Sequence, residues 1–171
     1  MGEDGPLLSI CIPTYNRANL LRSALLSVGP QVIGLEEDVE LIVSDNCSPD
    51  DTEDVVKEAS SRFPIRYHKN SENIGAIKNV LILTEELARG EYCWVIGDDD
   101  LIIPGGVAKV LEVLRSNPDV DFVFVNCMHM ELDRLISKPQ PVSSFDIKEE
   151  LRRGNNINEE YRVERWEQLI D

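Results

Sequence analysis

The sequence has no apolar run long enough to span a membrane. A transmembrane helix needs about 20 consecutive apolar residues, and polar or charged residues interrupt every apolar stretch of the 171-residue chain well before that length. Residues 1–6 are acidic and lack the basic and then apolar pattern of a secretory leader. We therefore expect a cytoplasmic protein without a transmembrane segment, for which peripheral contact with the inner face of the membrane remains open.

Basic residues are scarce. The chain contains 17 Lys and Arg residues against 32 Asp and Glu residues, so its formal net charge is −15. A protein that binds a nucleic-acid backbone needs clustered cations to displace counterions, and this charge excludes nucleic acid as an expected partner. A phosphate-bearing ligand would have to be bound by a few local cations, by backbone amides or by a metal ion.

Cysteine and histidine are also scarce. The chain has four cysteines without a CxxC pair, and its two histidines, His68 and His129, do not have the spacing of metal ligands. Cys11, Cys93 and Cys127 lie in apolar runs, where a reduced thiol packs as a small apolar side chain. Neither a disulfide framework nor a zinc site is therefore expected.

What the sequence does contain is a regular alternation of short apolar runs and amphipathic segments. The apolar runs predict strands at residues 7–12, 39–45, 65–68, 92–96 and 120–126. Helical spacing predicts helices between them, at residues 17–28, 49–62, 76–88 and 107–116. This order predicts an α/β fold, specifically an αβα sandwich in which helices cover both faces of a mainly parallel sheet.

Local signals predict where the first two helices begin. Asn16 is expected to cap the first helix, and Ser48 is expected to cap the second, because Pro49 suits the first helical position. Asp50 and Asp51 then place negative charge in the first turn, and we assign them mainly to capping.

The pattern weakens after residue 126. We predict one core domain over residues 1–127 and a second, partial segment with a tail over residues 128–171. Within the second segment, residues 128–136 suit a strand and residues 145–153 suit a short helix that ends at a glycine.

Polar and charged residues follow each predicted strand at the point where it ends. Parallel strands end at the same edge of their sheet, so these residues are expected to share a ligand-binding edge. The most distinctive group is the acidic run at residues 98–100. Adjacent carboxylates repel one another unless a cation relieves them, and hard divalent metals prefer carboxylate oxygens. The alternative is a solvated acidic turn.

Four segments carry a resemblance to a known enzyme family. They are IPTYNR at residues 12–17, VSDNCSPDDT at 43–52, NIGAIKN at 73–79 and GDDD at 97–100. In this order they resemble the family 2 glycosyltransferases, which have the GT-A fold with a Rossmann-like nucleotide-binding half and transfer a sugar from a nucleotide donor. The resemblance covers residues 7–127, and it is closest to the GDDD-type enzymes of bacterial surface polysaccharide synthesis.

The resemblance implies a binding site for the nucleotide of the donor. Pro13, Thr14 and Tyr15 match the loop that holds the base, and Arg17 belongs to the same donor-binding segment. Asp45 matches the residue that accepts a hydrogen bond from a pyrimidine N3–H, and because a carboxylate accepts but does not donate, UDP or dTDP is favoured. The alternatives are that Tyr15 fills the core and that Asp45 forms a turn.

The resemblance also implies contacts with the donor's phosphates and sugar. Asn73, Gly75 and Lys78 match the segment that crosses them, because Gly75 permits a close backbone approach and Lys78 supplies a positive charge. Lys78 also suits a solvated helix face. Asp98 matches a residue that contacts the ribose or metal-bound water.

A divalent cation, Mn²⁺ or Mg²⁺, is the implied cofactor. Asp99 and Asp100 match its ligands, and the ion would stabilise the charge that develops on the leaving diphosphate. The implied reaction is an inverting transfer of the sugar to a glycan or lipid-linked acceptor, assisted by a general base. We expect this base beyond Asp171, because the acidic pairs at residues 149–150 and 159–160 also suit an ordinary helix face. The catalytic residue is therefore unassigned, and we expect the chain to be an N-terminal fragment with an incomplete acceptor half.

Two other functions remain open from the sequence. One is a non-catalytic module that binds a nucleotide sugar without transferring it. The other is a sugar-1-phosphate nucleotidyltransferase, which has a similar αβα architecture. The second is disfavoured because the segment after the first strand, residues 13–17, lacks the glycine-rich phosphate loop that such an enzyme carries.

Overall fold

The structure, a computed structural model, describes residues 5–123 and residue 125. Its contacts divide the chain into two compact units, residues 1–111 and 112–171. The sheet and all the predicted site residues belong to the first unit. The boundary that the sequence places after residue 127 stays a prediction. The strand and helix predicted at residues 128–136 and 145–153 lie outside the described residues.

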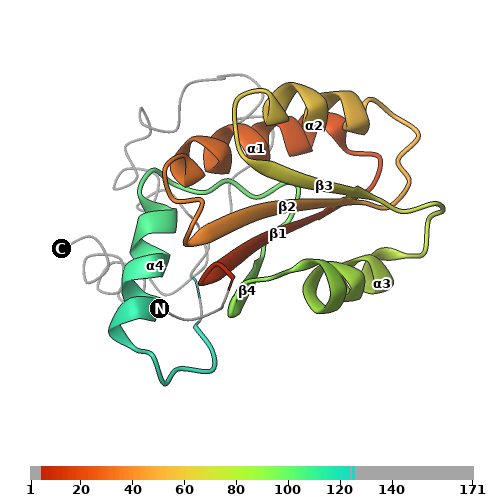
Figure 1. The fold of residues 1–171 in the computed structure, drawn as a ribbon. Helices are drawn as coiled ribbons and strands as arrows, with labels where there is room; N and C mark the ends of the chain where they lie inside the picture. Colours follow the sequence, from red (N-terminus) through yellow and green to blue (C-terminus); the bar gives the residue numbers. More distant parts are fainter. Residues whose placement is uncertain (1–4, 124, 126–171) are drawn as a thin grey trace, which may run out of the picture. The chain divides into compact units, whose positions relative to one another are not determined.

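A parallel sheet forms the centre of the first unit (Figure 1). Its strands are β1 (Leu8–Thr14), β2 (Val39–Asp45), β3 (Ile65–Lys69) and β4 (Tyr92–Val95), in the spatial order β3-β2-β1-β4. All three strand pairs are parallel. The predicted α/β class and the parallel sheet are confirmed.

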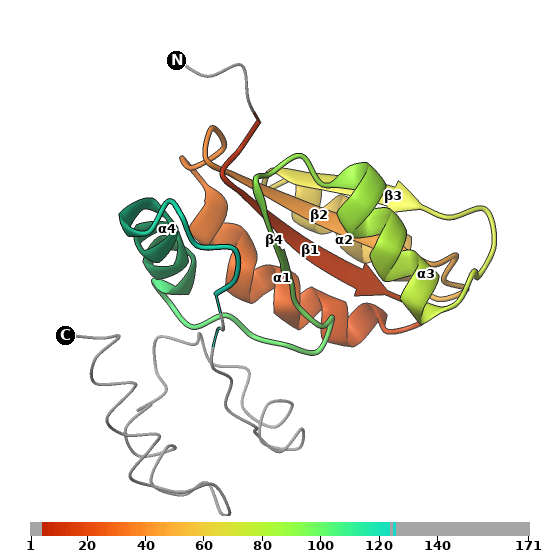
Figure 2. The ribbon, with the colours of Figure 1, turned by 90° about the horizontal axis from the view of Figure 1, so that it is seen from below.

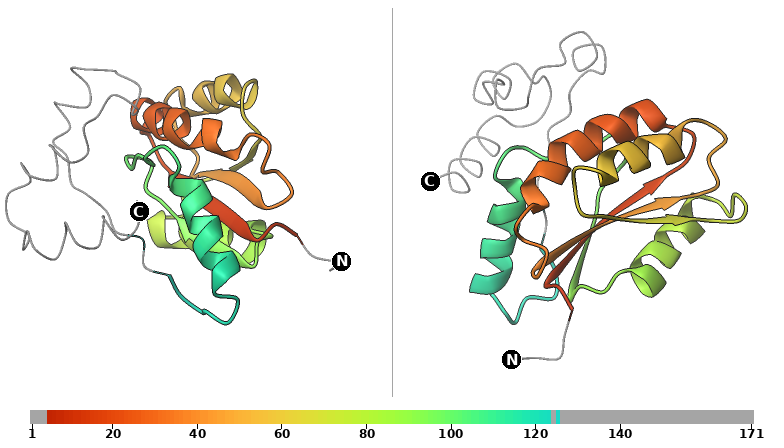
Figure 3. Two further views of the ribbon diagram at one scale, coloured as in Figure 1. Left: turned by 90° about the vertical axis from the view of Figure 1, so that its left-hand side faces the viewer. Right: turned by 45° about the horizontal axis from the view of Figure 1, so that its top comes forward.

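Helices cover both faces of this sheet. Helices α1 (Ala18–Val32) and α2 (Thr52–Ser60) lie together on one face, whereas α3 (Ala76–Leu81) and the π-helix η1 (Ile82–Leu87) lie on the other (Figures 1 and 2). Figure 3 shows the same arrangement from two further sides. The predicted αβα layers are therefore confirmed. A further helix, α4 (Gly106–Ser116), follows the acidic run.

The two central strands are buried on both faces, which explains their continuous apolar sequences. On one face, Cys11 and Ile42 pack against Leu83 of η1. On the other face, α1 contributes a buried stripe at helical spacing that includes Leu21 and Leu25. Each fully buried Leu or Ile side chain contributes about 1.5–3 kcal/mol relative to an exposed one, so these layers hold the sheet rigidly in place.

The strand register brings the carboxyl ends of the strands to one edge. Thr14 lies opposite Asp45 in the pairing of β1 with β2, and Asp45 lies opposite Lys69 in the pairing of β2 with β3. Hydrogen bonds continue one residue beyond these pairs, from Asn46 N to Thr14 O and from Asn70 N to Asp45 O, both at 2.9 Å. The loops after three strands therefore leave the sheet side by side.

Both predicted helix caps are wrong. Asn16 has a positive φ of 55° and does not cap α1, whose N-cap residue is Arg17 without a side-chain cap bond. The Ala18 N–H instead donates to the Asp50 carboxylate, from a distant loop, at 2.9 Å. Ser48 lies before α2, where its hydroxyl oxygen accepts a hydrogen bond from Asn16 N at 2.8 Å.

Asp50 serves the starts of both helices. Besides the bond from Ala18, its carboxylate accepts hydrogen bonds from the backbone N–H and the hydroxyl of Thr52, the first residue of α2. Burial alone would raise the pKa of Asp50, but these hydrogen bonds outweigh it and hold the pKa below its ordinary value. The capping role predicted for Asp50 is confirmed in this wider form, whereas Asp51, the N-cap residue of α2, makes no side-chain cap bond.

Two other segments differ from the sequence prediction. The helix expected at residues 76–88 changes at Ile82 from an α-helix to a π-helix, which ends at Leu87. The wider turn cannot be recognised from apolar spacing. The strand expected at residues 120–126 is wrong where the structure describes it, because residues 120–123 and 125 are not in a strand. Phe122 is 76 % exposed, so the apolar residues there do not find the buried surface that would support a central strand.

Candidate active site at the carboxyl edge of the sheet

A hydrogen bond joins the ends of β1 and β4. Thr14 Oγ1 donates to Asp98 Oδ2 at 2.8 Å, and both residues are buried. Thr14 is the last residue of β1, and Asp98 lies three residues after the end of β4. The first aspartate of the acidic run is therefore anchored to the sheet, not exposed on a solvated turn.

Arg17 binds the acidic run from the start of α1. Its Nη1 lies 3.0 Å from Asp98 Oδ1 and 3.4 Å from Asp99 Oδ2. The hydrogen bond and the charge of Asp98 raise the pKa of Arg17 above its ordinary value. Each oxygen of the Asp98 carboxylate thus has a donor, which is how a buried carboxylate tolerates its loss of water.

The other two aspartates are exposed. The Asp99 side chain is 54 % exposed, and the Asp100 carboxylate accepts a hydrogen bond from Gly97 N at 2.8 Å. Carboxylate oxygens are the ligand type that Mg²⁺ and Mn²⁺ prefer. In the part of the chain that the structure describes, however, no group of three His, Cys, Asp or Glu residues is arranged to hold a metal ion.

Asp45 is fully buried at the end of β2. Its Oδ1 accepts a hydrogen bond from Ser48 N at 2.8 Å, and its Oδ2 accepts one from the Tyr67 hydroxyl at 2.7 Å. Burial, together with the bond to Asp45 and its negative charge, raises the pKa of Tyr67. Both Asp45 oxygens are therefore already engaged, although each oxygen keeps a second lone pair. Tyr67 is a neighbour of the predicted site that the sequence did not identify.

A buried network of amide side chains supports the same edge. Asn79 Oδ1 accepts hydrogen bonds from Ser44 Oγ at 2.7 Å and from Asn70 Nδ2 at 2.9 Å. Asn70 Nδ2 also donates to Asn46 Oδ1 at 3.0 Å. This network joins the ends of β2 and β3 to helix α3. From the sequence, Asn79 belongs to the motif at residues 73–79, and Asn46 and Asn70 belong to the polar residues that follow two adjacent strands. The bonds that join the three side chains could not be predicted from those positions.

The same network fixes the loop before α3. Asn46 Nδ2 donates to Asn73 Oδ1 at 2.9 Å, and that oxygen also accepts a hydrogen bond from Gly75 N at 2.9 Å. Gly75 has a φ of +88°, a conformation that suits glycine alone among common residues. The segment predicted to cross the donor's phosphates is therefore held against the end of β2.

The remaining predicted site residues, Pro13, Tyr15 and Lys78, are not part of these hydrogen-bond networks. Tyr15 is 42 % exposed, Pro13 is half-buried in β1, and Lys78 lies exposed on α3. Among the described residues, no hydrogen bond or ion pair involves the Lys78 ammonium group or the Tyr15 hydroxyl. The structure thus brings Thr14, Arg17 and the acidic run together and leaves Tyr15 and Lys78 facing solvent.

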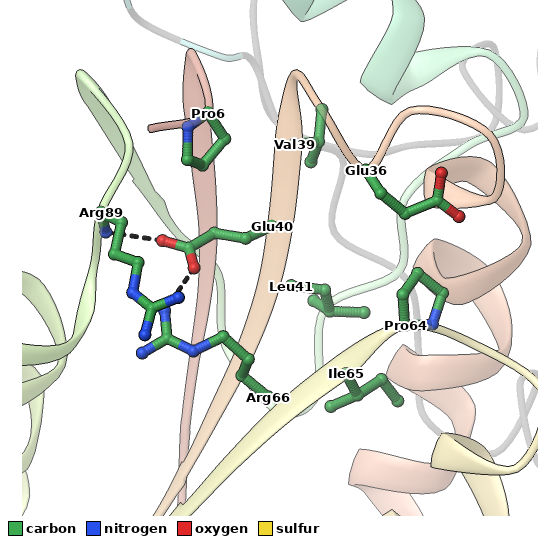
Figure 4. A pocket seen from close by; sticks show the side chains of 9 residues that line it. All are labelled: Pro6, Glu36, Val39, Glu40, Leu41, Pro64, Ile65, Arg66 and Arg89. Atoms are coloured by element: carbon green, nitrogen blue, oxygen red, sulfur yellow. Dashed lines mark hydrogen bonds and ion pairs between the residues drawn. The ribbon is translucent and has the colours of Figure 1, made fainter. Parts of the chain in front are cut away.

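A separate pocket of about 350 Å³ lies at the opposite, amino-terminal edge of the sheet (Figure 4). In it, Glu40 accepts hydrogen bonds from Ser9 Oγ and Arg89 N, and it forms an ion pair with Arg66. Burial would raise the pKa of Glu40, but these donors outweigh it and lower the pKa. Since the strand ends with the predicted site residues lie at the other edge, this pocket is distinct from the candidate site.

Comparison with known proteins identifies the family. The model of the family described as glycosyl transferase family 2 matches residues 9–163, which is most of the chain. The chain belongs to glycosyl transferase family 2. The family resemblance predicted from the four sequence motifs is confirmed.

Curated relatives of this family 2 chain include named glycosyltransferases. The chain is 39 % identical over 116 residues to the abequosyltransferase RfbV of Salmonella typhimurium. This match covers 67 % of the chain and 34 % of the relative. It is 33 % identical over 129 residues to the GalNAc(5)-diNAcBac-PP-undecaprenol beta-1,3-glucosyltransferase of Campylobacter jejuni. That match covers 72 % of the chain and 38 % of the relative. The chain therefore spans about a third of the length of these relatives.

Solved structures support the fold of the family 2 chain. The S. aureus TarS 1-349 complex with UDP superimposes with a TM-score of 0.54 at 22 % identity, covering 79 % of this chain and 45 % of that one. The mannosyltransferase PcManGT of Pyrobaculum calidifontis, in complex with GDP-Man and Mn²⁺, gives a TM-score of 0.50 at 21 % identity. The superposition covers 68 % of this chain and 34 % of that one. The fold agrees with the GT-A expectation.

Proposed function

We propose that the chain binds a nucleotide-diphosphate sugar at the carboxyl edge of its sheet, as part of a glycosyltransferase of cell-surface polysaccharide synthesis. The observation that carries this proposal is the junction of Thr14, Arg17 and Asp98, which joins the first and the last described motif of a family 2 chain at one sheet edge. Ligands of open α/β sheets bind beyond this edge.

The nucleotide would lie over the ends of β1 and β2. Tyr15, which follows Pro13 and Thr14 at the end of β1, offers an exposed ring against which a base can pack. Asp45 would act from beneath, accepting a hydrogen bond from a pyrimidine N3–H through the remaining lone pair of one oxygen. A UDP complex in one structural neighbour and a GDP-Man complex in another are consistent with a nucleotide donor, and Asp45 favours UDP or dTDP here.

The diphosphate would lie between Arg17 and the loop before α3. Gly75 leaves its backbone open to a close approach, and Asn73 holds that loop in place. Lys78 is exposed on α3, and its ammonium group has no ion-pair partner among the described residues. Arg17 and Lys78 are the cations expected to face the phosphates. Asp98, anchored by Thr14, would contact the ribose or a metal-bound water.

The exposed aspartates fit a hard divalent ion. Mg²⁺ is commonly held by one or two carboxylates together with substrate phosphates and water, so Asp99 and Asp100 supply enough protein ligands even though no group of three such side chains is arranged to hold a metal among the described residues. A Mn²⁺ complex of one structural neighbour supports this assignment. When bound, the ion supplies Lewis-acid stabilisation of the negative charge on the leaving diphosphate.

We further propose an inverting transfer to a glycan or lipid-linked acceptor. The family resemblance favours inversion, and the name of one curated relative includes an undecaprenol-linked substrate. A lipid-linked acceptor would place the reaction at a membrane surface. No helix among the described residues is long and apolar enough to cross a membrane. The general base is proposed to come from the acceptor side of the complete enzyme.

Calorimetric titration with UDP, dTDP, GDP and CDP, each with and without Mn²⁺, tests donor binding. We expect metal-dependent binding of UDP or dTDP, and at least a tenfold loss of affinity in Asp99→Asn, corresponding to about 1.4 kcal/mol. The matched control is Asp51→Asn, an exposed aspartate at the start of α2, which should bind as the unchanged chain does. If the chain bound none of the four nucleotides, with or without Mn²⁺, the proposal would be overturned.

A transfer assay separates an enzyme from a binding module. The chain is incubated with the nucleotide sugar whose nucleotide binds, and release of the free nucleotide is followed with and without a lipid-linked acceptor. Nucleotide release that depends on both acceptor and Mn²⁺ supports transfer. Binding without release would favour the non-catalytic module.

A further inference from the structure

The acidic run already holds a cation that belongs to the chain itself. Arg17 Nη1 lies within 3.4 Å of one oxygen of Asp98 and one of Asp99, so a single guanidinium nitrogen bridges two carboxylates. Among the described residues, Arg17 is the basic residue that forms ion pairs with this run. A divalent ion that bound Asp99 and Asp100, the ligands proposed above, would lie close to this guanidinium group, because Arg17 is already paired with Asp99.

The two partners of Arg17 differ in how firmly they are fixed. Asp98 is buried, and its other oxygen is held by Thr14, so this carboxylate stays in place. Asp99 and Arg17 are both about half exposed, with side chains 54 % and 52 % accessible. The Arg17 side chain therefore has the freedom to leave the carboxylates, whereas the buried carboxylate always requires a cation or a donor beside it.

We propose that Arg17 is an internal counter-ion that excludes a divalent metal from Asp99 and Asp100 until a nucleotide diphosphate arrives. This inference rests on the proposed donor site. The diphosphate offers planar pairs of charged oxygens that match the guanidinium fork, and it draws Arg17 away from the aspartates. The released Asp99 carboxylate then accepts the metal together with Asp100, so nucleotide and metal bind with positive coupling.

The coupling has a reciprocal consequence. If the nucleotide raises the affinity for the metal by a given factor, the metal raises the affinity for the nucleotide by the same factor. Arg17 is responsible for this coupling because its guanidinium group leaves the aspartates and binds the diphosphate. Removal of its charge should therefore strengthen metal binding to the nucleotide-free chain and weaken the coupling.

Titration of the nucleotide-free chain with Mn²⁺, followed by electron paramagnetic resonance of the free ion, tests the inference. The variant is Arg17→Gln, whose amide is still a hydrogen-bond donor but carries no charge. We expect it to bind Mn²⁺ about tenfold more tightly than the unchanged chain, because one repelling positive charge is removed. Arg17→Lys, which keeps the charge, should bind the ion as weakly as the unchanged chain.

Two controls locate the effect. Arg22→Gln removes an arginine that is also half exposed and ion-paired on α1, but with Glu58, so Mn²⁺ binding should not change. Adding Asp99→Asn to Arg17→Gln should abolish the gain. An affinity in Arg17→Gln that equals or falls below that of the unchanged chain, or a gain that persists in the double variant, overturns the inference.

A second arm measures the coupling. Mn²⁺ should raise the affinity of the unchanged chain for UDP by a larger factor than it raises that of Arg17→Gln. If Mn²⁺ raised the UDP affinity of both proteins by the same factor, the proposal that Arg17 moves from the aspartates to the diphosphate would be wrong. If the unchanged chain binds none of the four nucleotides, the proposed donor site fails, while the titration without nucleotide still decides whether Arg17 excludes the metal.

Discussion

Thr14 Oγ1 donates a hydrogen bond of 2.8 Å to Asp98 Oδ2 across 84 positions of sequence, and this bond fastens the acidic run to the central strand. It is one of the contacts through which the loop after β4 meets the end of β1. The same loop is also fastened by the ion pair between Arg17 and Asp98 and by the backbone hydrogen bond from Ile96 N to Cys11 O.

Replacement of Thr14 by valine should destabilise the chain while keeping the shape of the side chain. Valine lacks the hydroxyl group, so Asp98 Oδ2 loses its donor in a buried position, and such a loss costs about 1–3 kcal/mol. Urea unfolding of Thr14→Val measures this change in the free energy of unfolding. Thr14→Ser keeps the hydroxyl and should cost clearly less. A loss in Thr14→Ser without a loss in Thr14→Val would show that the methyl group matters, not the hydrogen bond.

Replacement of Asn79 by alanine should be equally damaging although Asn79 lies on a short helix. The change removes the acceptor of Ser44 Oγ and of one Asn70 bond in a buried network, so we expect a loss of about 1–3 kcal/mol. Thermal and urea unfolding measure it. The matched control is Asn19→Ala, an exposed asparagine on α1, which should change stability by about 0.5 kcal/mol or less. A loss of that small size in Asn79→Ala would contradict the network.

Glu40 should make the chain lose stability in acid. Its pKa lies below the ordinary value of 4.5, because hydrogen bonds and the Arg66 ion pair outweigh burial, so folding favours the charged form. This contribution is complete above about pH 4.5, and it is lost as the pH falls through the lowered pKa. Urea unfolding between pH 7 and pH 3 should show a shallower acid decline in Glu40→Gln.

Ser9→Ala provides an independent check on Glu40. It removes one donor from the charged carboxylate, so the folded-state pKa of Glu40 should be lowered less, and the acid decline should be smaller and end at a higher pH than in the unchanged chain. If Glu40→Gln and the unchanged chain lost stability with the same dependence on pH, the proposed role of the Glu40 ion pair and hydrogen bonds would be wrong.

The strands were predictable because local composition decides them. Residues buried on both faces of a sheet must be apolar in an unbroken run, and β1 and β2 have such runs. β1 nevertheless continues through Pro13, where the sequence prediction ended it. Pro13 still lies opposite Ser44 of β2, but proline is tolerated there because the pairing with β4 on the other side of β1 ends at Cys11.

The parts that sequence reasoning missed depend on contacts between distant segments. The start of α1 is capped by Asp50, from a loop that lies 32 positions away, and no local signal reveals this bond. The three aspartates of the acidic run are chemically identical, so their sequence does not tell which one is buried. The turn after Ile96 decides this by directing Asp98 inward to Thr14 and leaving Asp99 exposed.

The spatial order of the strands has a consequence for synthesis of the chain. β1 is made first and lies inside the sheet, but one of its two neighbours, β4, is made only after three other strands. Until residues 92–95 emerge and pair, β1 presents an open apolar edge, which is a template for pairing with other unfinished chains. The nascent protein therefore passes through a period of aggregation risk that ends when its fourth strand arrives.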